Sequence, residues 1–136
     1  MLAASGLFPQ LALAEFNRAA FEAKHLPEAY KALGLAVPEL SAAIQITASD
    51  IAENGAVVPV GVATSLPRVK QLLILVDKNP SVLVAHFHLT DSVEPNITTR
   101  TKMAETSNLY AVAVTQDGKV YYAKKEVKVT LGGCGG

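Results

Sequence analysis

The sequence has 136 residues, of which 50% are hydrophobic and 18% are charged, so one domain with a core of its own is expected. Twelve basic residues balance twelve acidic ones, and this zero formal net charge argues against a nucleic-acid-binding protein, which normally carries a basic excess. The single cysteine, Cys134, cannot form a disulfide within the chain.

The first 14 residues, MLAASGLFPQLALA, are uncharged and end in Ala12-Leu13-Ala14, a small-x-small pattern typical of signal-peptidase sites. The stretch is too short to span a bilayer, and Gly6 and Pro9 interrupt it. We therefore expect residues 1–14 to be the remnant of an export signal that lacks its basic front part. An ordinary apolar leader is the alternative.

The next segment predicts two short helices. Its apolar stripe consists of Phe16, Ala20, Phe21, Ala23 and Leu26. Pro27 should break or restart the helix, and a second helical turn from Glu28 to Leu33 should end at Gly34, a favourable C-cap residue. This segment carries no catalytic pattern, and we expect it to cover one end or edge of the core.

From Glu39 onward, short runs rich in Val, Ile, Thr and Tyr alternate with turn residues. Asp117-Gly118 is the clearest hairpin signal, and Glu53-Asn54-Gly55 offers the positive φ of a tight turn. The expected strands are 42–48, 56–64, 69–77, 82–90, 96–102, 109–115 and 120–131. This spacing predicts an immunoglobulin-like antiparallel β-sandwich of about seven strands, so residues 15–131 should form one helix-plus-sandwich domain.

Two features within the strands are candidate interaction sites. His86 and His88 are two apart, which places both imidazoles on one face of a strand, but a metal site needs three or four ligands and no others are evident, so no metal is expected. The stretch from Ala56 to Val62 is almost continuously apolar, and Pro59 favours an edge strand. Either the N-terminal helix or a partner subunit would then cover this stretch, and we expect a partner contact there.

The chain ends in GGCGG, directly after an alternating strand. Glycine has the largest backbone freedom of any residue, so Gly132, Gly133, Gly135 and Gly136 should make residues 132–136 a flexible arm. No neighbouring base or cation in the sequence would lower the pKa of Cys134, so the arm suits a thiol that is presented to the active sites of other proteins. A labelling tag, or a tail that forms intermolecular disulfides, are the alternatives.

This ending resembles that of the SoxY family, the sulfur carriers of the bacterial thiosulfate-oxidising Sox system. Further similarity lies in Glu53-Asn54-Gly55-Ala56-Val57-Val58-Pro59-Val60, in Thr106-Ser107-Asn108-Leu109-Tyr110 and in Asp117-Gly118-Lys119. The resemblance implies a periplasmic protein, which agrees with an export-signal remnant. It also implies that Cys134 is the attachment site for sulfur and that the four glycines form a swinging arm.

The resemblance further implies the partners. A SoxZ-like β-sandwich subunit would pair with the chain as a heterodimer. A haem c enzyme would attach thiosulfate to Cys134, a hydrolase would release sulfate, and other enzymes would oxidise the remaining sulfane sulfur. The chain itself would be no enzyme and would hold no cofactor apart from the covalent adduct. Two other classes stay open: a thiol oxidoreductase that uses Cys134 catalytically, and a structural or adhesive domain with an incidental tail.

Overall fold

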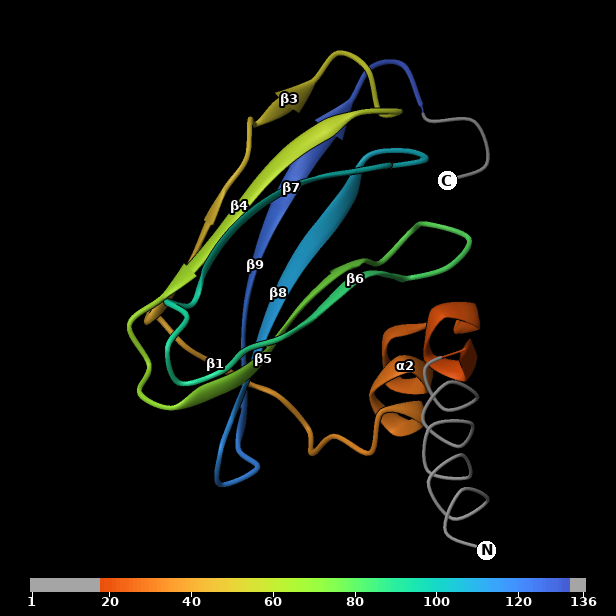
Figure 1. Ribbon diagram of the computed structural model, residues 1–136. Helices are drawn as coiled ribbons and strands as arrows, with labels where there is room; N and C mark the ends of the chain where they lie inside the picture. The colour runs from red at the N-terminus through yellow and green to blue at the C-terminus, as the bar shows by residue number, and fades with distance from the viewer. Residues whose placement is uncertain (1–17, 133–136) are drawn as a thin grey trace, which may run out of the picture.

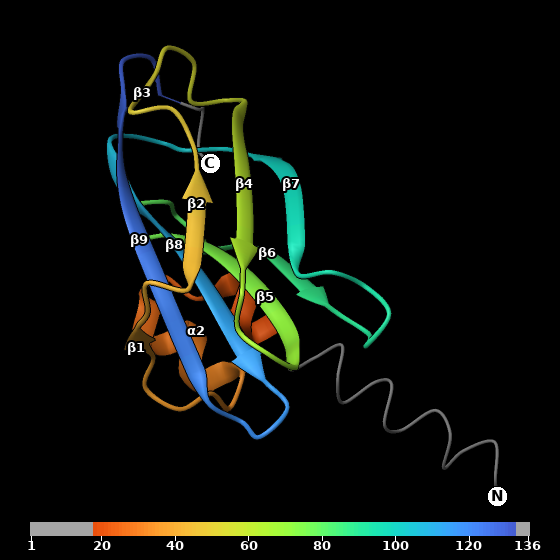
Figure 2. The same ribbon diagram turned by 90° about the vertical axis from the view of Figure 1, so that its left-hand side faces the viewer.

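The computed structural model describes residues 18–132, which form three layers. Two short helices cover one face of a large β-sheet, and a smaller sheet packs on the other face (Figures 1 and 2). The predicted fold class, a mainly β sandwich with an N-terminal helical segment, is confirmed. No helix within the described part of the chain is long and apolar enough to cross a membrane.

The helices begin the described chain. Residues 18–22 are helical, and α2 spans Leu26–Ala32. Pro27 lies in the first turn of α2, where a missing backbone N–H costs nothing, so it starts this helix as predicted. Gly34 has a φ of 67° and ends it, with the N–H of Gly34 donating to the Lys31 carbonyl and that of Leu35 to the Tyr30 carbonyl.

All seven predicted strands are present, together with two that were not predicted. The strands are β1 (Glu39–Leu40), β2 (Ile44–Thr47), β3 (Ile51–Ala52), β4 (Val58–Thr64), β5 (Val69–Val76), β6 (Leu83–His88), β7 (Asn96–Thr101), β8 (Ser107–Thr115) and β9 (Val120–Val129). The two additional strands, β1 and β3, have two residues each and pair in parallel with β9, whereas the other pairs are antiparallel. A two-residue strand has no periodicity to read, and these two form along the outer edge of the ten-residue β9.

The larger sheet has the order β1-β9-β8-β5-β6, with β3 also paired to β9, and the smaller sheet has the order β2-β4-β7. The hairpin predicted at Asp117-Gly118 joins β8 to β9, and Gly118 has a φ of 83°. The turn at Glu53-Asn54-Gly55 differs from the prediction because neither Asn54 nor Gly55 has a positive φ. Instead the Asn54 side chain closes the turn by accepting a hydrogen bond of 2.9 Å from the Ala56 N–H.

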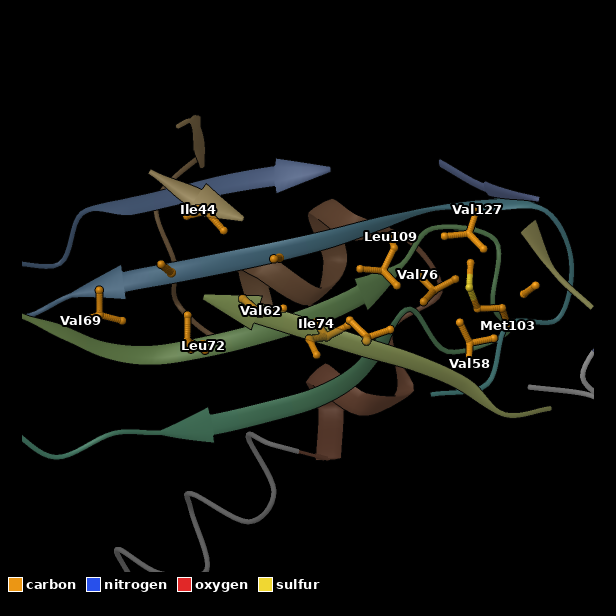
Figure 3. Packing of buried hydrophobic residues seen from close by; sticks show 14 residues of the cluster. Ile44, Val58, Val62, Val69, Leu72, Ile74, Val76, Met103, Leu109 and Val127 are labelled. Atoms are coloured by element: carbon orange, nitrogen blue, oxygen red, sulfur yellow. The ribbon is translucent and has the colours of Figure 1, made fainter. Parts of the chain in front are cut away.

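The core lies in two clusters, one on each face of the larger sheet. Leu72 and Ile74 point between the two sheets, while Leu73 and Leu75 point toward the helices. Strands β5 and β8 are therefore the ones covered on both faces. Figure 3 shows the cluster between the sheets, to which Ile44, Val58, Val62 and Met103 contribute from other segments.

The prediction that Ala56 to Val62 forms an edge strand is wrong, because strand β4 is the middle strand of the smaller sheet. Val58, Val60 and Val62 are buried in the core of the domain itself, so these three side chains cannot face a partner subunit. A partner contact through the outward residues Pro59 and Gly61 stays a prediction. Pro59 is tolerated because the pairing of β4 with β2 ends at Gly61, so β4 is paired only with β7 at this residue.

Candidate functional site: the root of the C-terminal tail

The GGCGG tail leaves the domain at one end of the sandwich, where the loop after β3, the loop before β8 and the end of β9 come together (Figure 1). Of the predicted site residues, Gly132 belongs to the described chain, whereas Cys134, Gly133, Gly135 and Gly136 lie outside it. Their assignment as attachment site and arm stays a prediction. The structure instead shows how the domain holds the point from which the tail departs.

Strand β9 is secured up to its last residues by backbone hydrogen bonds. The Lys128 N–H donates to the Asp50 carbonyl at 2.9 Å, and the Thr130 N–H donates to the Ala52 carbonyl at 3.1 Å. The Val129 N–H donates to the Thr106 hydroxyl oxygen at 3.0 Å. These bonds tie β9 to the segment around β3 and to the loop before β8, so the tail starts from a supported strand end.

Gly55 links the two loops that flank the tail. Its N–H donates to the Leu131 carbonyl at 2.7 Å, and its carbonyl accepts from the Met103 N–H at 2.7 Å. Gly55 and Met103 are both buried, so the hydrogen bond between them lies in a low-dielectric environment, whereas Leu131 is exposed.

Asn79 holds the loop before β8 through two hydrogen bonds of its side chain. Its side chain is buried, and its Nδ2 donates to the Lys102 carbonyl at 2.7 Å while its Oδ1 accepts from the Ala104 N–H at 2.9 Å. The amide thus bridges the residues on either side of Met103. In the sequence Asn79 stands between Lys78 and Pro80, a combination typical of a turn, and nothing there indicates a contact with residues more than 20 positions later.

Gly132 lies directly over this loop. A Cβ atom added to Gly132 would lie 2.2 Å from the Ala104 carbonyl oxygen, far inside van der Waals contact. The position therefore requires glycine for steric reasons, a role that the argument from backbone freedom did not predict. We call Gly55, Met103, Ala104 and Gly132 the arm seat.

The cavity lined by Asn79 includes none of the four arm-seat residues in its lining. It has a volume of about 380 Å³, and its charged lining residues, Arg100 and Lys102, are both basic. Cations favour a thiolate or an anionic adduct, but a general base is needed to take the proton. No histidine or carboxylate lines this cavity.

His86 and His88 lie together on one face of β6, as predicted, with ring centroids 4.4 Å apart. Burial, and secondarily His88, lower the pKa of His86 to about 4, so this imidazole is neutral near pH 7. Its Nε2 is 2.7 Å from the Gln71 Oε1 atom. In residues 18–132, no three His, Cys, Asp or Glu side chains come together as metal ligands.

Comparison with known proteins places this architecture among sulfur carriers. The family described as "Sulfur oxidation protein SoxY" matches residues 29–134. The solved structure of the sulfur carrier protein SoxY from Chlorobium limicola f thiosulfatophilum is 45% identical, with a TM-score of 0.63, and the match covers 71% of this chain and 87% of that one. None of the curated proteins matches the sequence.

A second solved structure shares the fold alone. The superoxide reductase (neelaredoxin) T24K from Ignicoccus hospitalis is 18% identical, with a TM-score of 0.57, over 63% of this chain and 78% of that one. The family match and the 45% identical solved structure place the chain in a class of β-sandwich sulfur carriers. Because the family match extends over most of the chain, the protein belongs to the SoxY family.

Proposed function

We propose that this protein carries the intermediates of thiosulfate oxidation covalently on Cys134 and presents them to partner enzymes. The observation that carries the proposal is that the SoxY family match runs to residue 134 and so includes the cysteine. The supported strand end beneath the tail agrees with a residue that must be offered outward. The carrier would perform no turnover of its own and would hold no cofactor.

The proposed chemistry balances with external partners. The thiol and thiosulfate, Cys–SH and S₂O₃²⁻, give Cys–S–S–SO₃⁻, one proton and two electrons, and a haem c enzyme accepts the electrons. A hydrolase then uses water to cleave the bond between the sulfane sulfur and the sulfonate, which yields a persulfide and hydrogen sulfate. Sulfur–sulfur bonds at an accessible cysteine are reversible, which suits a carrier.

Intact mass spectrometry of the protein purified from its native host tests the proposal. During active thiosulfate oxidation we expect mass additions that match a thiosulfate group or sulfane sulfur, map to Cys134 and disappear on reduction. The same host carrying Cys134→Ser is the control and should show none. A bare thiol at Cys134 while thiosulfate is being consumed would contradict the proposal.

We further propose a heterodimer with a SoxZ-like subunit in the periplasm. Membership in the SoxY family supports a Sox context for both ideas. Native mass spectrometry of the complex from the host should show one copy of each subunit. Cell fractionation with a cytoplasmic marker should recover the chain in the periplasmic fraction, and recovery only with that marker would refute export.

A further inference from the structure

We propose that Gly132 is held in place as part of the arm seat and is not the first flexible residue of the C-terminal arm. Asn79 is the positioning residue that holds the arm seat in place. The direction in which the arm leaves the domain would then be set by the fold, and free backbone rotation would begin only after Gly132. The proposal relies on the proposed function only for what the arm carries.

The first support is the way in which Gly55 joins both sides of the seat. One residue donates to the Leu131 carbonyl and accepts from the Met103 N–H, each at 2.7 Å. The end of the tail's strand and the loop before β8 are therefore tied through a single buried residue. A displacement of either one would break a hydrogen bond in a partly dry environment, where an unpaired backbone group is costly.

The second support is the bridge made by Asn79. Its amide spans from the Lys102 carbonyl to the Ala104 N–H, while the Met103 side chain between them is fully buried. The loop before β8 is held on both sides of the core residue Met103, so the Ala104 carbonyl cannot easily move away from Gly132. An amide suits this task because it both donates and accepts, which an aspartate or a leucine of similar size does not.

The third support is the steric fit of Gly132 over that carbonyl. Since a Cβ would come within 2.2 Å of a backbone oxygen held by Asn79, any other residue must move either the tail or the loop. Cys134 is two residues farther along, so about 7 Å of extended chain separates its Cα from the seat. We expect a fixed starting point at so short a distance from the thiol to lower the ordering cost of bringing it into a partner's active site.

The test uses the native cysteine as the position of a probe. A nitroxide attached to Cys134 broadens the NMR signals of backbone amides that it approaches. The readout is the ratio of the broadening at residues 100–105 to the broadening at residues 53–57, and we expect this ratio to be high in the wild-type chain. In Gly132→Ala this ratio should fall, because the tail must leave the Ala104 carbonyl. The matched control, Gly133→Ala, adds the same methyl group one residue later and should keep the wild-type ratio.

A second pair of variants tests Asn79. Asn79→Asp keeps the shape and the acceptor for the Ala104 N–H but loses the donor to Lys102, so the ratio should shift in the direction of Gly132→Ala. Asp77→Asn is its control, because Asp77 holds the Asn108 N–H and does not touch the seat. This pair also decides the question if Gly132→Ala does not fold.

An unchanged ratio in both Gly132→Ala and Asn79→Asp would overturn the proposal, as would an equal shift in Gly133→Ala. Loss of stability alone should not reproduce the expected pattern, since we expect Asp77→Asn to weaken a nearby loop without moving the arm. The broadening is measured without sulfur on Cys134 or any partner enzyme. A negative result for the arm seat would thus not contradict the carrier function. A failure to find sulfur adducts on Cys134 would likewise not contradict the proposal about the arm seat.

Discussion

Asn79 shows how much of the site depends on one side chain. It is one of three buried polar residues in the described chain, and both of its hydrogen-bonding groups are used at the arm seat. Removing the amide takes away two part-buried hydrogen bonds, each worth about 0.5–1.5 kcal/mol. The residue therefore links the stability of the domain end to the placement of the tail.

His86 makes a prediction for pH dependence. Burial is the main cause that lowers its pKa from the usual 6.5 to about 4. The folded state thus binds this proton less tightly than the unfolded chain, so its contribution to stability is complete above about pH 6.5 and declines as the pH falls toward about 4. The side chain is partly exposed, so solvent screening reduces the size of the effect.

Urea denaturation of wild type and His86→Gln at about pH 7 and about pH 4.5 measures this contribution. We expect the midpoint of His86→Gln to fall less between the two conditions than that of wild type. The exposed His25 provides the control, and His25→Gln should retain the wild-type decline. Equal declines in all three proteins would show that His86 does not contribute.

At the scale of elements, β4 differs from the role that the sequence indicated for it. The apolar run in β4 has small residues at its outward positions Gly61 and Ala63, which look apolar in sequence but lie on the outer face of the smaller sheet. The strands buried on both faces are instead β5 and β8, because the helices cover the second face of the larger sheet. Composition alone could not separate a small outward residue from a buried one.

Substitution of Val60 tests the corrected placement. The side chain is 1% exposed, so Val60→Asp buries a charge as well as removing apolar contacts and should destabilise the domain by about 3 kcal/mol or more. Val57→Asp is the control, because Val57 is 52% exposed and should change stability by about 0.5 kcal/mol or less. Urea midpoints compare the two. A folded Val60→Asp with normal stability would restore the interpretation of this stretch as a partner surface.

At the scale of the whole molecule, the single cysteine makes a prediction about self-association. Cys134 has no other cysteine in the chain to pair with, and an accessible thiol in an oxidising compartment drifts toward disulfides. We therefore expect the isolated subunit to form a dimer linked by Cys134 of each copy. Non-reducing gel electrophoresis should show this dimer, and reductant or Cys134→Ser should remove it. A dimer band that persists in Cys134→Ser would have another origin.

The seven long strands, the β8–β9 hairpin and the end of α2 were predictable because local rules determine them. Alternation within a run, Asp117-Gly118 in a turn and Gly34 after a helix each act through neighbouring residues. Strands β1 and β3 escaped prediction because they exist only as partners of β9. The turn at Asn54 was expected to need a positive φ, whereas a side-chain hydrogen bond closes it.

By itself, the sequence determined the fold class, the family resemblance and the cysteine on which the proposed function depends, because these follow from periodicity and from a contiguous motif. Only the tertiary structure decided which strands are buried on both faces and where the tail is held. Gly55, Asn79, Ala104 and Gly132 are far apart in the chain and meet only when β9 returns past the loops at the domain end. Such contacts join residues separated by more than 20 positions, and no local pattern encodes them.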